Sequence, residues 1–174
     1  MPDQTIYQFT ATTIEGKEIS FSAYKGKVLI ILNIATQCGQ VPQLEKLEAI
    51  YQKYKEQGLE IVAFPSNQFA QEPRAGKAIM EFCERNYGIT FPVFAKIDVK
   101  GKNAHPLFKF LGAKKLNGKF SAQPYWNFYK YIFDRDGNAV DYFISHTYPN
   151  KKRVILSIEK TLQKPAAFNA PPVS

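Results

Sequence analysis

The chain has 174 residues, of which 45% are apolar, a size and composition typical of one globular domain with a sizeable core. No stretch approaches the roughly 18 consecutive apolar residues of a membrane-spanning helix, and no secretory signal opens the chain, so we expect no stable membrane insertion. The formal net charge is +8, but the basic residues are scattered and accompany no nucleic-acid-binding motif, so we expect no nucleic-acid partner. With only two cysteines, the chain is unlike small secreted proteins that many disulfides stabilise, and we expect it to be located in the reducing cytoplasm.

The first predicted elements are a hairpin, a buried strand and a helix. Residues 6–22 contain two Thr- and Phe-bearing segments around a turn, which indicates a β-hairpin. An uninterrupted apolar run at 28–34 is typical of a strand buried on both faces. Apolar residues then recur at steps of three and four over 44–54, behind Pro42, and predict one face of a helix that stops at Gly58.

The second half of the chain continues the alternation of strands and helices. A second buried strand is predicted at 59–64, a helix at 78–87 and an extended segment at 91–99. The remaining predicted elements are a short helix at 106–112, two strands at 128–133 and 140–144 joined by an Asp-Gly turn, and a helix at 152–163. We expect a flexible tail over 165–174, and no repeat or linker divides the single domain predicted for residues 1–174.

This order of elements predicts an α/β fold: a central mixed sheet flanked by helices, with an N-terminal β-hairpin. In such sheets the ligand crevice lies at the carboxyl ends of the strands. Cys38 follows the first buried strand at such an end, and Gln68 follows the second. Topology alone therefore brings a thiol and a carboxamide to one edge of the sheet.

Cys38 lies in a strand-to-helix loop, where unpaired backbone N–H groups and the helix dipole favour a thiolate. The other cysteine is Cys83, so redox chemistry is the first hypothesis. His105 and His146 are both remote from Cys38 in sequence, which argues against a Cys–His nucleophile pair. The cysteines and histidines also lack the short spacings of metal sites, so we expect no metal and no cofactor.

Several motifs together indicate a known family. They stand in residues 33–39, 63–69, 71–73, 81–92, 96–101, 126–128 and 134–137. In their order and spacing the chain resembles the glutathione peroxidase family, a branch of the thioredoxin-like fold, over about residues 5–163. The resemblance implies a peroxidase that reduces hydrogen peroxide and organic or lipid hydroperoxides.

By position in these motifs, Cys38 matches the family's peroxidatic residue. Gln68, Trp126 and Asn127 match the residues that complete the family's catalytic tetrad. Their side chains offer neutral N–H donors, which suit a thiolate and then the oxyanion of a leaving group. The resemblance implies that a hydroperoxide oxidises Cys38 to a sulfenic acid.

Cys83 matches the resolving cysteine of two-cysteine members, which implies a Cys38–Cys83 disulfide recycled by thioredoxin. Many relatives have a further cysteine where this chain has Ser66, which leaves Cys83 as the only intramolecular partner. Cys83 is predicted in the middle of a helix, on its apolar face. Because a disulfide needs Cα atoms within about 7 Å, we expect this helix to unwind locally.

Other departures concern the rim and the surface. Ala70 and Arg74 stand where relatives often have glycine, which leaves substrate preference open. The segment 112–125 is shorter than the subunit-contact loop of tetrameric relatives, so we expect a monomer with an open cleft.

Three alternative functions remain. The first is a glutathione-dependent peroxidase in which Cys83 only packs. The second is a peroxide-sensing relay that passes the oxidation from Cys38 to a partner protein. The third is a thioredoxin-like binding module without catalysis.

Overall fold

The computed structural model describes residues 4–167 and contains the predicted mixed sheet and hairpin. The strands are β1 (Thr10–Thr12), β2 (Glu18–Ser20), β3 (Val28–Ile34), β4 (Leu59–Pro65), β5 (Lys130–Phe133) and β6 (Ala139–Phe143). β1 and β2 form a separate antiparallel pair, and the main sheet has the order β4-β3-β5-β6. β3 runs parallel to β4 and antiparallel to β5, which pairs antiparallel with β6.

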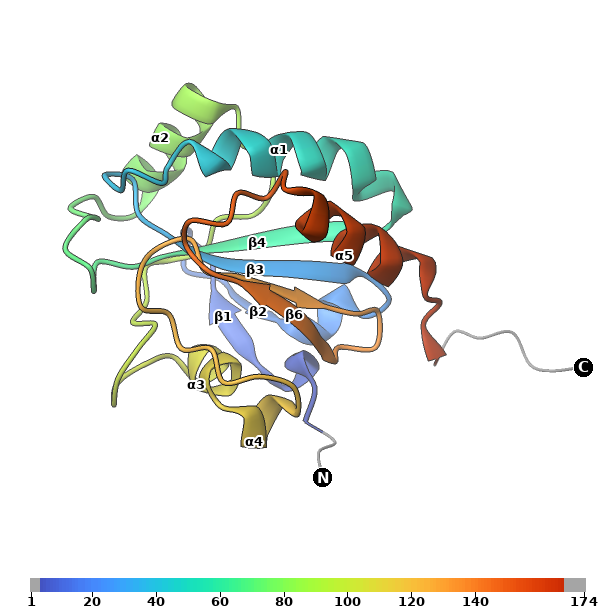
Figure 1. Ribbon diagram of the computed structural model, residues 1–174. Helices are drawn as coiled ribbons and strands as arrows, with labels where there is room; N and C mark the ends of the chain where they lie inside the picture. Colours follow the sequence, from blue (N-terminus) through green and yellow to red (C-terminus); the bar gives the residue numbers. More distant parts are fainter. Residues whose placement is uncertain (1–3, 168–174) are drawn as a thin grey trace, which may run out of the picture.

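Helices cover both faces of this sheet. They are α1 (Gln43–Tyr54), α2 (Lys77–Tyr87), α3 (Pro106–Gly112), α4 (Lys114–Asn117) and α5 (Lys152–Gln163), with 3₁₀ turns η1 (Ile6–Gln8), η2 (Phe21–Tyr24) and η3 (Lys55–Gln57). Figure 1 shows α1, α2 and α5 on one side of the sheet, and α3, α4 and the hairpin on the other. Both predicted buried strands are confirmed, as are the predicted hairpins and the helices at α1, α2, α3 and α5; the single turn of α4 was not predicted.

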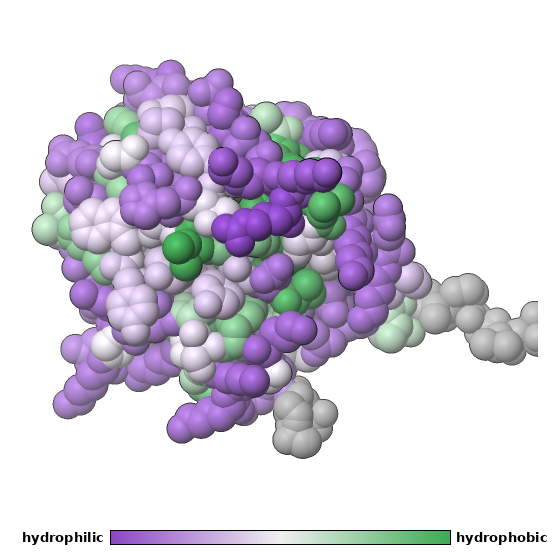
Figure 2. Space-filling model, in the orientation of Figure 1, coloured by the Kyte–Doolittle hydropathy of each residue, from purple (hydrophilic) through white to green (hydrophobic). Residues whose placement is uncertain are grey.

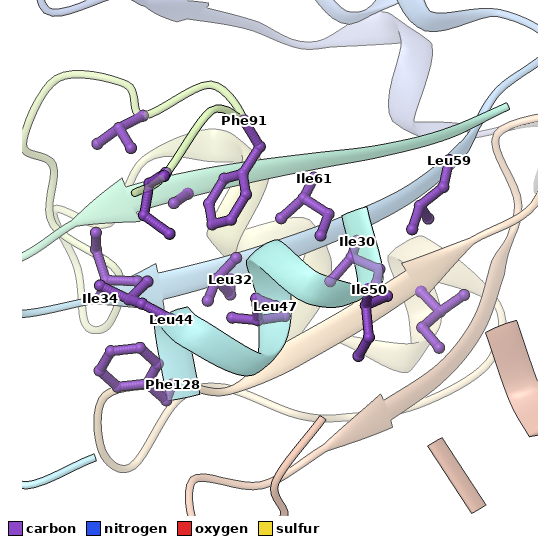
Figure 3. Packing of buried hydrophobic residues seen from close by; sticks show 14 of the residues in the cluster. Ile30, Leu32, Ile34, Leu44, Leu47, Ile50, Leu59, Ile61, Phe91 and Phe128 are labelled. Atoms are coloured by element: carbon purple, nitrogen blue, oxygen red, sulfur yellow. The ribbon is translucent and has the colours of Figure 1, made fainter. Parts of the chain in front are cut away.

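Two hydrophobic cores lie on the two faces of β3, because successive side chains of a strand point in opposite directions. Ile30 and Leu32 pack in one core with Leu47 of α1, and Figure 3 shows these side chains between the helix and the sheet. Leu29 and Ile31 belong to the other core, beneath α3 and the hairpin. All seven residues of β3 are buried, as its continuous apolar run predicts.

The segment 91–99 is extended, as predicted, but it does not form a regular strand of the main sheet. Pro92 has no N–H to donate, and the segment forms β-bridges at Val93 and Phe94 that are isolated from any ladder. Ala63 donates to the Pro92 carbonyl and Phe94 donates to the Ala63 carbonyl, at 3.0 and 2.8 Å. The segment therefore lies along β4 without extending its ladder.

The two ends of the described chain lie close to the β5–β6 hairpin. Ile6 donates its backbone N–H to Gly137, and Ala167 donates to both carboxylate oxygens of Asp136 at 2.9 and 3.1 Å. Ala166 is buried. The rest of the tail that we expect to be flexible, residues 168–174, lies outside the described residues.

The surface seen in Figure 2, in the orientation of Figure 1, is mainly hydrophilic, with small hydrophobic patches that are separated from one another. Within residues 4–167, none of the helices has the length and apolar character that crossing a membrane requires.

Candidate active site

Cys38 lies in the turn between β3 and α1, at the left end of the sheet in Figure 1. Its side chain is 2% exposed, and its Sγ accepts a hydrogen bond from the backbone N–H of Gln40 at 3.3 Å. The thiol therefore has the kind of hydrogen-bond donor that its position predicts, a backbone N–H in the turn before a helix. Helix α1 itself begins at Gln43, five residues after the thiol.

Gln68 follows β4 at the same end of the sheet, and its amide is held by the backbone. Its Oε1 accepts from the N–H groups of Val99 and Lys100 at 2.6 and 2.9 Å, and its Nε2 donates to the Lys100 carbonyl at 3.1 Å. In the described part of the chain, no hydrogen bond joins this amide to the Cys38 thiol. Gln68 thus fixes segment 99–100 against the β4 loop.

Trp126 and Asn127 lie just before β5. Because β5 is antiparallel to β3, its beginning lies beside the end of β3. Asn33 of β3 ties this segment down: its Nδ2 donates to the Trp126 carbonyl and its Oδ1 accepts from the N–H of Tyr129, each at 3.0 Å. Phe128 lies between them with φ +66°, a strained value for a bulky residue that these bonds maintain.

Gln71 joins these segments. Its backbone carbonyl accepts from the N–H of Gln37 at 3.0 Å, and its side-chain Oε1 accepts from Asn127 Nδ2 at 3.2 Å. The rings of Phe69 and Trp126 lie 5.3 Å apart. The structure therefore brings together the three segments that carry the predicted site residues.

The site combines a buried and an exposed part. Asn127 is fully buried, and its Oδ1 has no hydrogen-bond partner among the described residues. Trp126 is 36% exposed and Tyr125 beside it is 78% exposed. An unpaired buried oxygen is costly, so this amide is a group that a bound proton donor would satisfy.

Cys83 lies in the second turn of α2 and is fully buried. Burial raises the pKa of its thiol to about 12, and the nearby negative charges of Glu72 and Glu84 act in the same direction. Both cysteines are free thiols and α2 is an intact helix. The structure is therefore the reduced form.

Sequence reasoning missed several residues that build this site. Asn33 and Gln71 stand within the motif stretches 33–39 and 71–73, so a signal was available for them. Gln40 contributes only its backbone, and backbone donors leave no trace in residue type. In the described chain, no group of three or more His, Cys, Asp or Glu side chains is placed to hold a metal ion.

The fold and site together define a class: a thioredoxin-like α/β protein with a backbone-bonded thiol at the carboxyl end of its central strand. Comparison with known proteins agrees. The family model described as glutathione peroxidase matches residues 6–112. Among solved structures, Trgpx in apo form is 31% identical and superposes with a TM-score of 0.74, covering 94% of this chain and 99% of its own. A thiol:disulfide interchange protein of the thioredoxin family from Chlorobium tepidum, 18% identical over 93% of this chain and 96% of its own, shares the fold with a TM-score of 0.63.

Curated relatives are more similar still. A glutathione peroxidase of Lactococcus lactis is 49% identical over 146 residues, which is 83% of this chain and 92% of the relative. The hydroperoxy fatty acid reductase gpx1 of Synechocystis is 41% identical over 168 residues, covering 92% and 97%. The chain belongs to the glutathione peroxidase family, and it is a peroxidase.

Proposed function

We propose that the protein is a two-cysteine thiol peroxidase in which Cys38 is the peroxidatic residue. The Cys38 thiolate attacks the terminal oxygen of a hydroperoxide, the O–O bond breaks, and an alcohol or water leaves after taking up a proton. Cys38 becomes a sulfenic acid and the peroxide is reduced by two electrons. The observation that supports this most is the hydrogen bond from the Gln40 N–H to the Cys38 Sγ at 3.3 Å, since such a donor stabilises a thiolate without pairing it in a salt bridge.

Asn127, Trp126 and Gln68 complete the proposed site. The unpaired Oδ1 of Asn127 is the proposed acceptor for the proton of a bound hydroperoxide, and this buried amide would have to become accessible to reach it. The indole N–H of Trp126 is a donor for the leaving oxygen. Gln68 holds the loop through its three backbone bonds, and its amide would have to release them to act as a donor itself.

Cys83 is the proposed resolving residue. Its thiol attacks the Cys38 sulfenic sulfur, an S–S bond forms, and the hydroxyl leaves as water. A thioredoxin-type dithiol then reduces the disulfide by exchange. Because Cys83 is buried within an intact α2, this step requires local opening of the helix.

Thiol titration and trapping test both cysteines. Peroxide treatment should consume both thiols of the wild-type protein, whereas the Cys83→Ser protein should stop at a sulfenic acid that a dimedone-type reagent traps. Cys38→Ser should abolish peroxide consumption, because a serine hydroxyl cannot be oxidised to a sulfenic acid. Full thioredoxin-linked turnover by Cys83→Ser would overturn the resolving role, and activity in Cys38→Ser would overturn the peroxidatic role.

The second candidate is a glutathione-dependent peroxidase in which Cys83 only packs. The complete burial of Cys83 and its pKa of about 12 favour this alternative, because both oppose formation of the attacking thiolate. Steady-state assays with each reductant separate the two. Thioredoxin-linked turnover that depends on Cys83 supports our proposal, and equal turnover of wild type and Cys83→Ser with glutathione supports the alternative.

We also propose that the substrates include fatty-acid hydroperoxides, as the name of the Synechocystis relative suggests. The exposed rings of Tyr125 and Trp126 offer apolar surface for an acyl chain, and Lys100, 4.8 Å from the Phe69 ring, offers a positive charge for a carboxylate. Tyr125→Ser should raise KM for linoleic acid hydroperoxide and leave that for hydrogen peroxide unchanged. Equal changes for both substrates would exclude this role.

The proposed setting is the cytoplasm, where thioredoxin-type reductants recycle disulfides. We further propose that the protein acts as a monomer. The segment 112–125 before β5 is shorter than the loop that makes subunit contacts in tetrameric relatives, and all the proposed site residues come from one chain. Light scattering at working concentration should give a mass near 19.8 kDa, and a mass of two or four chains would contradict it.

A further inference from the structure

A buried carboxylate links the Cys38 loop to the segment that precedes α2. Glu72 is fully buried, and its oxygens accept from the backbone N–H of Thr36 at 2.9 Å, the hydroxyl of Thr36 at 2.6 Å and the N–H of Arg74 at 3.3 Å. The Nζ of Lys96 also donates to the Glu72 backbone carbonyl at 3.0 Å. The segment from 72 to 74 is therefore held rigidly against the turn that carries Cys38.

Arg74 extends from this segment to two other parts of the molecule. Its Nη1 donates to the hydroxyl of Thr36 at 2.8 Å, two residues before Cys38. Its guanidinium lies over the ring of Phe82, 4.6 Å from the centroid, and Phe82 directly precedes Cys83. A single side chain thus connects the turn of one cysteine with the helix of the other.

The beginning of α2 has few other attachments. Gly76 at its N-cap provides no side-chain hydrogen bond, no acidic residue stands in the first turn, and only Ile79 and Cys83 are fully buried. The other end is well closed, since the N–H of Gly88 donates to the Glu84 carbonyl at 2.9 Å. Opening of α2 is therefore expected to start at its N-terminal end, and it reaches Cys83 only when the contact of Arg74 with Phe82, in the middle of the helix, is broken.

The geometry points to Arg74 as a positioning residue that keeps α2 folded, so that Cys83 stays buried within the helix. Arg74 thereby limits the rate at which the Cys38–Cys83 disulfide forms. The rate claim rests on the proposed resolving role of Cys83; the holding of α2 does not. Loss of the Arg74 side chain leaves Glu72 with both donors of Thr36, so the Cys38 turn keeps its support. The substitution removes the stacking of Arg74 on Phe82 and its hydrogen bond to Thr36 together, so α2 loses its link to the Cys38 turn.

The first experiment measures how often α2 opens, without any peroxide chemistry. In a Cys38→Ser background, Cys83 is the only thiol, and its rate of modification by a maleimide reports the open population. Arg74→Ala should raise this rate about 10-fold, the combined effect of one cation–π contact and one hydrogen bond. Arg74→Lys should give a modification rate between those of the parent protein and Arg74→Ala, because lysine keeps the charge and loses the planar stacking.

Arg85→Ala is the matched control. Arg85 is exposed on the same helix and lines the same groove as Arg74 and Phe82, and the structure gives it no hydrogen bond to the Cys38 turn. Its removal should leave the rate of Cys83 modification within about 2-fold of the rate in the protein that carries Cys38→Ser alone. Equal modification rates for Arg74→Ala and Arg85→Ala would overturn the inference.

The second experiment follows one turnover of the two-cysteine protein by rapid quench and intact mass. In Arg74→Ala, oxidation of Cys38 by hydrogen peroxide should keep its wild-type rate. The next step, in which the sulfenic acid loses water and forms the disulfide, should accelerate by the same factor as maleimide modification. Faster modification with an unchanged disulfide rate would overturn the claim that Arg74 limits resolution. A wild-type protein that forms no Cys38–Cys83 disulfide would overturn the proposed function instead, and the maleimide comparison would still decide whether Arg74 holds α2.

Discussion

At the scale of single residues, Lys130 is the least expected group in the molecule. It is 2% exposed and stands at the start of β5, opposite Leu32 of β3. Its Nζ lies within hydrogen-bond distance of four neutral oxygens: Gln43 Oε1 at 2.8 Å and the carbonyls of Phe128, Ile144 and Ser145 at 2.6, 3.1 and 3.4 Å. In the described chain no carboxylate lies within salt-bridge distance of it. Burial lowers its pKa to about 7.

This lowered pKa predicts a rise of stability with pH. The unfolded chain keeps Lys130 protonated up to its ordinary pKa of 10.5, so above pH 7 the unfolded state binds more protons than the folded state. The free energy of unfolding should therefore increase by about 1.5 kcal/mol between pH 7 and 8.5. The raised pKa of Cys83 acts in the opposite sense above its ordinary value of 9.0 and limits the window.

Urea unfolding at half-unit pH steps checks this, with Lys130→Met as the test variant. The variant should show no rise in this window, whereas Lys109→Met, at an exposed position, should keep the wild-type profile. A rise that persists in Lys130→Met would assign the pH dependence to another group.

Gln68 carries the second prediction at this scale. Truncation in Gln68→Ala leaves the N–H groups of Val99 and Lys100 without their acceptor, and Val99 is fully buried. We expect a loss of about 2 kcal/mol in the free energy of unfolding, in addition to any loss of peroxidase rate. Thermal unfolding measures it, and a stability equal to wild type would mean that Gln68 does not hold the loop.

The site could be predicted in part, and the limit is physical. Topology placed Cys38 and Gln68 at one sheet edge, because strand ends follow from hydrophobic periodicity. Trp126 and Asn127 needed the family resemblance, since nothing in a single Trp-Asn pair indicates that it lies beside β3. The contacts of Gln40 and Glu72 depend on loop conformation, which residue types do not determine.

At the scale of secondary-structure elements, the C-terminus of α2 provides a clean backbone test. Gly88 has φ +62°, and a Cβ added there would meet no atom within 4 Å. Gly88→Ala should therefore cost about 1 kcal/mol through backbone strain alone. Unfolding in urea measures this, and a neutral effect would mean that the helix ends differently in solution.

Two other glycines serve as references. Gly137→Ala should cost more than Gly88→Ala, because its φ is +81° and a Cβ there would lie 2.7 Å from the Tyr7 ring. Gly39 has neither a positive φ nor a neighbour within 4 Å, so Gly39→Ala should leave stability almost unchanged. The expected order of cost is Gly137, Gly88, Gly39.

Elements were predictable where one signal dominated. The continuous apolar run of β3 and the one-sided periodicity of α5 each depend on burial, which residue type reports directly. The segment 91–99 has strand-like composition, but Pro92 interrupts its ladder and the bridges are isolated. Whether an extended segment joins a sheet depends on distant partners, and composition does not report those.

At the scale of the whole molecule, Arg135 connects parts that are far apart in the sequence. It stands in the turn between β5 and β6, and its guanidinium donates to the carbonyls of Gly26, Gln57 and Leu162 at 2.8, 2.7 and 3.0 Å. Gln57 ends η3 and Leu162 lies in the last turn of α5. One cation thus caps two helical C-termini and the entry to β3, where carbonyls are unpaired and the helix dipole is negative.

This arrangement predicts a large loss of global stability without any change in the active site. Arg135→Ala removes the donor from three carbonyls at once and should lower the free energy of unfolding by about 3 kcal/mol. Arg135→Lys keeps the charge but has no planar fork to reach three acceptors, so it should recover less than half of the loss. Peroxide consumption at 20 °C, where both variants remain folded, should match wild type, because Arg135 contacts neither the Cys38 turn nor α2. A loss of activity that exceeds the loss of folded protein would instead mean that the hairpin turn and the site are coupled through β3.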